Sequence, residues 1–164
     1  MRRKIRNAEN LNNGLKPFKF PKSPPNLFEK QPDTLPEKVF AYWKTQVETQ
    51  IGSPPKLECL VTFVLDAGGK IADHYFVCIG DSDVFPTNTV RLFRKAVIAE
   101  ASYIVLVHNH KNGDTEPSKD DIQFTNNVLS RSDLLGIHLV DHIIVGHEGV
   151  TSIRERGCLP HWGQ

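Results

Sequence analysis

Cysteine is scarce in this chain, and a long apolar run is missing. The three cysteines have no paired spacing, which indicates reduced thiols and not a disulfide framework. No stretch approaches the roughly 20 apolar residues of a membrane helix, and no apolar segment follows the charged amino terminus, so neither a membrane anchor nor a signal peptide is indicated. We therefore expect a cytoplasmic protein without a membrane partner. Its 164 residues are enough for one hydrophobic core without disulfides.

Charge is divided unevenly along the chain. Residues 1–30 hold eight Lys/Arg against two Glu, whereas residues 31–164 hold twelve Lys/Arg against seventeen Asp/Glu. The basic part is also rich in Pro and Asn, so we expect residues 1–34 to be an arm that is poorly ordered in isolation. Such an arm can bind nucleic acid or an acidic protein, or it can dock on its own domain or on a partner. The side chains that favour docking are Phe18, Phe20, Leu27 and Phe28.

Helical and strand patterns alternate after the arm. Residues 35–50 carry apolar side chains at helical spacing, with Pro36 suited to the first turn and Gly52 to a stop, and we expect 35–55 to lead into a domain of residues 56–164. The elements expected next are a strand over 58–65, a hairpin turn over 67–70, a strand over 71–79 and a helix capped by Thr87 or Asn88 and running to about 101. They are followed by a strand from 103, a helix over 118–135, a strand over 137–145, a turn over 146–149 and a short strand near 150–153. This order predicts an α/β fold in which helices flank a mixed central sheet.

Two histidines follow the apolar, β-branched residues 103–107, which are typical of a buried strand. His108 and His110 would face the same way, because side chains two apart on a strand share a face, whereas Asn109 would point to the opposite face. A loop rich in Gly, Pro and short polar residues follows, and a helix then begins with Asp121 in its first turn. Two imidazoles and one carboxylate leave the fourth tetrahedral position for water, as in a catalytic zinc site. We therefore predict that His108, His110 and Asp121 bind one zinc ion per chain.

Each member of this pattern also has a plainer interpretation. An isolated His-x-His pair is more often two ordinary polar residues than a metal site. Ser118 and Asp121 have the spacing of a capping box, and that role is compatible with metal binding if Asp121 points toward the histidines. Glu58 stands at the start of the 58–65 strand, where it is either an exposed acid or the proton carrier that a catalytic zinc site needs. All five positions together favour the metal site.

With these five positions the chain resembles the JAB/MPN domain metallopeptidases that carry the JAMM motif, and it looks most like their RadC branch. The resemblance covers roughly residues 56–158 and implies a JAB/MPN fold, which is similar to the cytidine-deaminase architecture. It is carried by His108-Asn-His110 with Gly113-Asp114, by Pro117-Ser-x-x-Asp121-Ile122, by Leu135-Gly-Ile-x-Leu-Val-Asp141-His142-Ile-Ile-Val-Gly146 and by Ser152-Ile-Arg-Glu-Arg156-Gly. RadC-like sequences usually continue His-Asn-His with proline and serine, where this chain has Lys111 and Asn112, so specificity is expected to differ while metal binding survives.

The resemblance implies a zinc metallopeptidase or isopeptidase that hydrolyses an amide bond, typically at the tail of a ubiquitin-like protein. Zinc-activated water would attack, Glu58 would act as general base, and Ser118 would donate a hydrogen bond to the oxyanion. The RadC branch is conventionally called a DNA-repair protein. The alternative is therefore a DNA-repair or mobile-element-associated protein that binds nucleic acid through residues 1–30. Nothing here resembles the helix-hairpin-helix region of full-length RadC, so we favour a protein or peptide partner; the sequence is also compatible with a homodimer.

Other metal chemistries fit the residues less well. The consecutive His-Asn-His is not an HNH nuclease, whose name describes residues scattered over a ββα unit, and a zinc nucleobase deaminase needs a Pro-Cys-x-x-Cys that this chain lacks. In the strand over 137–145, Asp141 would either orient a ligand imidazole or accept hydrogen bonds from backbone. His138 and His142, four apart on what we expect to be one face, are assigned to the surface or to a local hydrogen-bond network.

Overall fold

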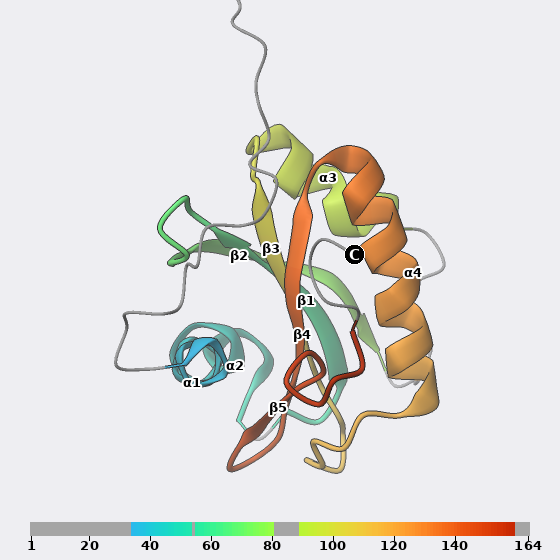
Figure 1. The fold of residues 1–164 in the computed structure, drawn as a ribbon. Coiled ribbons are helices and arrows are strands. Elements are labelled where there is room, and N and C mark those ends of the chain that lie inside the picture. Colours follow the sequence, from blue (N-terminus) through green and yellow to red (C-terminus); the bar gives the residue numbers. More distant parts are fainter. Residues whose placement is uncertain (1–33, 54, 81–88, 160–164) are drawn as a thin grey trace, which may run out of the picture.

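The computed structural model describes residues 34–53, 55–80 and 89–159. The described strands are β1 (Glu58–Leu65), β2 (Ile71–Gly80), β3 (Tyr103–Asn109), β4 (His138–Val145) and β5 (Val150–Ser152), and the helices are α1 (Leu35–Tyr42), the π-helical η2 (Trp43–Val47), α2 (Glu48–Ile51), α3 (Val90–Ile98) and α4 (Lys119–Leu135). They occur in the predicted order. The α1, η2 and α2 segments follow one another and cover one face of a five-stranded sheet, while α3 and α4 cover the other (Figure 1). None of the described helices combines the length and apolarity needed to cross a membrane.

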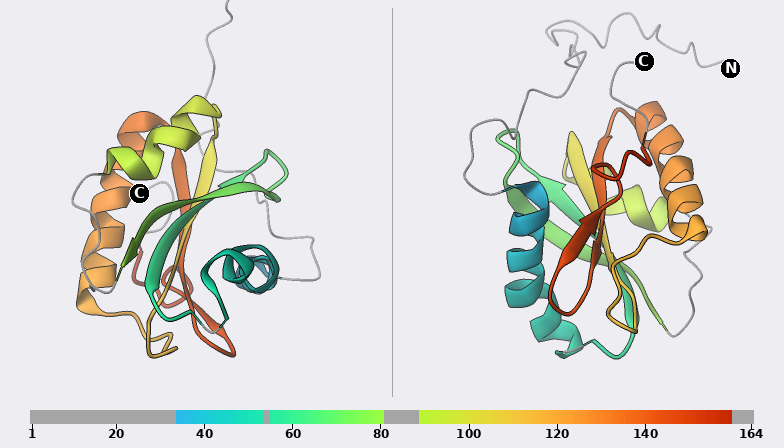
Figure 2. Two further views of the ribbon diagram at one scale, coloured as in Figure 1. Left: turned by 180° about the vertical axis from the view of Figure 1, so that it is seen from behind. Right: turned by 60° about the horizontal axis from the view of Figure 1, so that its bottom comes forward.

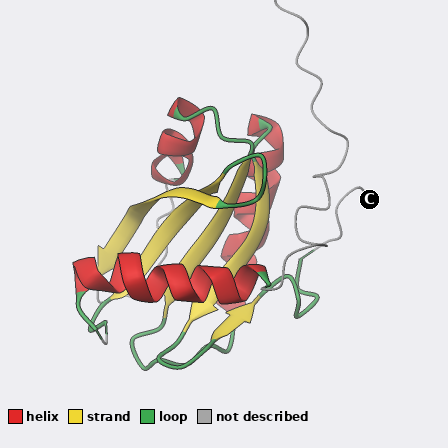
Figure 3. Cartoon of the chain, turned by 90° about the vertical axis from the view of Figure 1, so that its left-hand side faces the viewer, coloured by secondary structure: helices red, strands yellow, loops and turns green. Residues whose placement is uncertain are grey.

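The sheet is mixed, as predicted. Its strand order is β2-β1-β3-β4-β5; β1 pairs antiparallel with β2 and β3, β3 pairs parallel with β4, and β4 pairs antiparallel with β5. Parallel strands need a crossover connection, and α4 supplies it between β3 and β4. Figures 2 and 3 show the helices on both sides of the sheet from three further directions.

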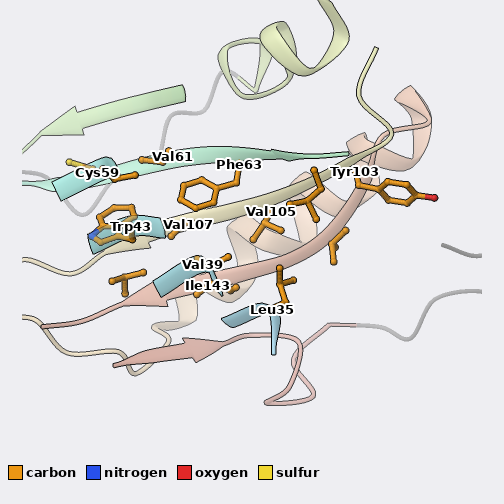
Figure 4. Close-up of a cluster of buried hydrophobic side chains, with 14 residues drawn as sticks. Leu35, Val39, Trp43, Cys59, Val61, Phe63, Tyr103, Val105, Val107 and Ile143 are labelled. Carbon is orange, nitrogen blue, oxygen red and sulfur yellow. The ribbon is translucent and has the colours of Figure 1, made fainter. Parts of the chain in front are cut away.

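The helical segment from α1 to α2 packs against one face of the sheet. Val39 and Trp43 are fully buried against the inner side chains of β1, β3 and β4 (Figure 4). Val47 is fully buried in the same cluster. The predicted stop is confirmed, because Gly52 ends the helix at φ 89°, a conformation that favours glycine. The π-helical turn in its middle was not predicted.

The opposite face of the sheet is covered by the predicted amphipathic helices α3 and α4. Leu92, Phe93 and Ala96 of α3 and Val128 of α4 are buried against apolar side chains of β1, β3 and β4. The predicted caps Thr87 and Asn88 lie outside the described residues, which resume at Thr89 directly before the helix. The helix ends at Ile98 and not near residue 101, so the prediction of its end was wrong.

A bulge in β4 changes the face on which its residues lie. The register against β3 shifts between Ile104 and Val105, which pair with Leu139 and Asp141, so Val140 is the additional residue. His138 therefore stacks on Tyr103 at 5.6 Å, on the face of the N-terminal helix, while His142 packs against Phe124 of α4. The prediction that these two histidines share a face was wrong, because the bulge breaks the alternation of a regular strand.

Candidate metal centre

The predicted site residues meet where β1, β3 and α4 come together. His108 is the penultimate residue of β3 and His110 directly follows the strand, while Asp121 lies in the first turn of α4. Glu58 is the first residue of β1, and Ser118 is the N-cap of α4. Together they line one cavity of about 480 Å³, whose floor holds the buried His108 and Asp121.

The two imidazoles and the carboxylate converge on a common point. His108 Nε2 lies 3.0 Å from His110 Nε2 and 3.2 Å from Asp121 Oδ1, and His110 Nε2 lies 3.4 Å from Asp121 Oδ2. Donor atoms at the corners of a zinc tetrahedron with bonds of about 2.0–2.1 Å are about 3.3–3.4 Å apart. The three side chains thus have the types and the spacing of ligands that can hold a metal ion.

The electrostatics of this cluster favour an ionised carboxylate between two imidazoles. Burial would raise the pKa of Asp121, but the two imidazoles and the Ser118 hydroxyl beside the carboxylate outweigh burial and hold that pKa well below its ordinary value. Burial lowers the pKa of His108 despite the nearby carboxylate, whereas the hydrogen bond to Asp121 raises the pKa of the less buried His110. The site therefore offers a cation one full negative charge and one imidazole that is neutral near neutral pH.

The end of β3 is joined to the start of β1 by Asn109. Its Oδ1 accepts a hydrogen bond from Cys59 N at 3.0 Å and its Nδ2 donates to Leu57 O at 3.0 Å, so the amide holds the backbone on both sides of Glu58. The Glu58 carboxylate in turn accepts a hydrogen bond from Lys111 N at 3.1 Å. Asn109 is buried and faces away from the histidines, as the alternation predicted, but its role in placing Glu58 was missed.

Ser118 and Asp121 form the predicted capping box. Asp121 N donates to Ser118 Oγ at 3.1 Å, and Ser118 N donates to Asp121 Oδ2 at 2.7 Å. The Ser118 hydroxyl also donates to Asp121 Oδ2, again at 2.7 Å. The same carboxylate thus caps the helix and faces both histidines, so the two interpretations of this pair are compatible in one geometry.

Comparison with known proteins assigns the chain to a family. A family model described as "RadC-like JAB domain" matches residues 34–158. The chain belongs to the RadC-like JAB domain family. It is 33% identical over 127 residues to a UPF0758 protein of Thermotoga maritima, covering 77% of this chain and 57% of the relative. It is also 30% identical over 124 residues to a UPF0758 protein of Methanosarcina acetivorans, covering 76% of this chain and 52% of the relative. The chain therefore spans about half the length of these curated relatives.

Within this JAB domain, His142 and Thr125 connect the cluster to the interior of the protein. His142 Nε2 lies 2.8 Å from His108 Nδ1, and its Nδ1 lies 2.6 Å from Thr125 Oγ1. His142 belongs to a local hydrogen-bond network, as predicted, but its contact with His108 was not foreseen. Burial, together with the nearby His108, holds the pKa of His142 well below its ordinary value.

The sequence left two roles open for Asp141, and the structure shows the second, in which the carboxylate accepts hydrogen bonds from backbone. It accepts hydrogen bonds from Ser152 Oγ at 2.5 Å, Arg154 N at 3.1 Å and His142 N at 2.7 Å, while the Arg154 guanidinium donates to the Val140 and Leu139 carbonyls. Burial raises the pKa of Asp141 to about 6 against these hydrogen bonds. Asp141 therefore stabilises the bulge in β4 and the chain after β5.

The loop between the segments that carry the candidate metal ligands is packed against the β4–β5 turn. A Cβ on Gly146 would lie 2.5 Å from Gly113 O, and a Cβ on Gly113 would lie 2.5 Å from the His147 ring. Thr151 Oγ1 donates to Thr115 Oγ1 at 2.9 Å, and the guanidinium of Arg156 pairs with Glu116. These contacts fix the loop that runs from His110 to Ser118, and they give several residues of the family pattern a physical role.

Proposed function

We propose that this JAB domain is a zinc-dependent metallopeptidase or isopeptidase that hydrolyses an amide bond in a protein or peptide. The observation that carries the proposal is the convergence of His108, His110 and Asp121 in a cavity that also contains Glu58. Three protein ligands leave a coordination position for water, which separates a catalytic zinc site from a structural one. Family membership supports the same chemistry.

Each residue of the cavity has a part in the proposed reaction. His108, His110 and Asp121 would hold the zinc ion, which when bound would lower the pKa of a coordinated water to about 7 and polarise the scissile carbonyl. Glu58 takes the proton of the attacking water and delivers it to the leaving amine. Its carboxylate is kept at the cavity wall by Lys111 N and by the hydrogen bonds of Asn109 to the adjoining backbone.

Ser118 would stabilise the developing oxyanion. Its hydroxyl lies on the cavity wall and donates to Asp121 Oδ2 in the structure, so it must rotate toward the substrate to act. Removing one such donor costs about 10²–10³ in kcat in other acyl-transfer enzymes. The expected substrate is an extended polypeptide, and the tail of a ubiquitin-like protein is the form that the family resemblance suggests.

Metal content and peptide cleavage test the proposal without a known substrate. Purified protein is measured by elemental mass spectrometry and then incubated with a peptide library from a digested proteome, with new termini read by mass spectrometry. We expect about one zinc per chain and recurrent cleavage in the wild type, zinc without cleavage in Glu58→Gln, and neither in the His108→Ala/His110→Ala double variant. Glu148→Gln, an exposed acid of the β4–β5 turn, is the matched control and should behave as the wild type.

Two results would contradict this assignment. Full zinc content in the double variant would show that the ligands lie elsewhere. Undiminished cleavage by Glu58→Gln would remove Glu58 as the base while leaving the metal site intact.

A further inference from the structure

A chain of short contacts runs from helix α4 through strand β4 to the first histidine of the site. It begins at Asp121 O, passes through Thr125 Oγ1 and both ring nitrogens of His142, and ends at His108 Nδ1. Thr125, His142 and His108 are all buried. Because each atom along this path can donate or accept in only a few ways, the direction of every hydrogen bond can be worked out.

The Thr125 hydroxyl fixes the direction at one end. Its oxygen lies 2.5 Å from the carbonyl oxygen of Asp121, which can only accept, so the single hydroxyl proton must point to that carbonyl. The same oxygen lies 2.6 Å from His142 Nδ1. Two lone pairs cannot face one another at this distance, so His142 Nδ1 must carry a proton and donate it to Thr125 Oγ1.

The protonation of His142 then determines the direction of its hydrogen bond with His108. His142 is fully buried, which disfavours a cationic imidazole, and a neutral ring that is protonated on Nδ1 has an unprotonated Nε2. His142 Nε2 therefore accepts a hydrogen bond at 2.8 Å, and the donor is His108 Nδ1. A neutral His108 protonated on Nδ1 has its lone pair on Nε2, the atom that faces His110 and Asp121.

We propose that Thr125 and His142 are positioning residues that hold His108 in the tautomer whose Nε2 is ready to bind a metal ion. The benefit for metal binding rests on the proposed function, whereas the ring protonation itself does not. A metal-binding histidine usually donates its other N–H to a carboxylate, a carbonyl or water. Here a second imidazole accepts it, and a threonine one turn after the ligand Asp121 orients that imidazole. Helix α4 thus carries the ligand Asp121 and, through Thr125 and His142, determines which nitrogen of the ligand His108 is protonated.

Nitrogen NMR on the metal-free protein tests the tautomer directly. Long-range proton–nitrogen spectra of protein labelled with ¹⁵N-histidine distinguish a protonated ring nitrogen from a bare one. We expect Nδ1–H and bare Nε2 for both His108 and His142. A proton on Nε2 of His108 in the wild type at pH 8 would overturn the proposal, whatever the variants do.

Two threonine variants test the part played by the hydroxyl. Thr125→Val removes the acceptor of His142 Nδ1–H, so the His108 ring is expected to shift toward Nε2–H. Zinc affinity, measured against a competing chelator, should fall by about 10–100-fold, the usual effect of losing an outer partner of a ligand. Thr125→Ser keeps the hydroxyl and should restore both readouts. Thr45→Val is the matched control, because Thr45 Oγ1 also donates to the carbonyl four residues earlier, Ala41 O, on a helix of the other face.

The outcomes separate this inference from the proposed function. If the wild type shows the expected tautomers but binds no zinc, the proposed function fails and the assignment of the ring protons stands. If it binds zinc and Thr125→Val changes neither the His108 spectrum nor the affinity, the positioning role is wrong and the metal site stands. If Thr125→Val does not fold, the wild-type spectrum and the Thr125→Ser variant still decide.

Discussion

Replacing Ser118 by alanine should separate its two roles, because they change different quantities. The substitution removes the bond from Asp121 N to Ser118 Oγ and the bond from the hydroxyl to Asp121 Oδ2. It leaves the third bond of the capping box, from Ser118 N to Asp121 Oδ2, in place because that donor is backbone. The Asp121 carboxylate therefore keeps one of its two anchors at the helix start.

The expected loss of stability follows from those two bonds. An N-cap serine contributes about 1 kcal/mol, and an exposed hydroxyl bond to a carboxylate adds about as much at most, so the free energy of unfolding should fall by about 1–2 kcal/mol. For a protein of this size that corresponds to a decrease in Tm of about 3–8 °C. Because Asp121 remains anchored through Ser118 N, zinc affinity should fall by only about tenfold.

Urea unfolding followed by circular dichroism measures the first quantity, and chelator competition measures the second. Ser130→Ala is the matched control, since Ser130 lies on the same helix and donates to Asn126 O away from the site. On any peptide that the wild type cleaves, kcat should fall by a further 10² or so if the hydroxyl serves the oxyanion. An unchanged free energy of unfolding would refute the capping argument, and a decrease in kcat no larger than the loss of zinc occupancy would refute the catalytic one.

The remaining predictions concern the ligands, the loop between them and the protons on them. His110→Ala should abolish stoichiometric zinc binding at little cost in stability, because that ring is the more exposed of the two histidine ligands; zinc retained in equilibrium dialysis would remove it from the ligand set. Gly146→Ala should lower the free energy of unfolding by about 1–3 kcal/mol and weaken zinc binding, because its Cβ would lie 2.5 Å from Gly113 O. Gly149→Ala is the control, since nothing lies within 4 Å of its Cβ position, and it should change neither quantity in the same unfolding and chelator assays. Zinc affinity should fall about tenfold for each pH unit below the raised pKa of His110, since zinc must displace that one proton, and should level off above it. A calorimetric titration series that shows no such dependence between pH 5 and 8 would mean that no ligand imidazole is protonated there.

Most of the fold could be predicted because β1, β3 and β4 are short apolar runs and α3 has apolar side chains at helical spacing. The ends of β1 and the start of β5 were placed to the residue, and Ser118 was identified as the start of α4 from its spacing to Asp121. Local patterns also singled out the three candidate ligands, since His108 and His110 lie at and just after the end of one strand and Asp121 lies just beyond the following loop.

The sequence could not predict the contacts that depend on tertiary packing. Thr125 and His142 are 17 positions apart and meet only because α4 lies over β4. The bulge at Val140 has no local signal in an apolar strand, and it moves His142 to the face of the site. Residues 1–30, on which the nucleic-acid alternative depends, lie outside the described residues, so that alternative and the division at residue 55 stay predictions.

The distribution of the site along the chain limits how far the domain can be shortened. Glu58 comes from β1, the proposed ligands from the end of β3, the residue after it and the start of α4, and the proposed acceptor of His108 Nδ1–H from β4. A recombinant fragment that ends before residue 142 would keep every proposed ligand and the base, yet its His108 would have no imidazole to receive the Nδ1 proton. The same order applies during synthesis on the ribosome. A nascent chain whose β4 has not yet emerged would bind metal weakly, and its affinity would rise to the full value only when β4 pairs with β3 and brings His142 next to His108.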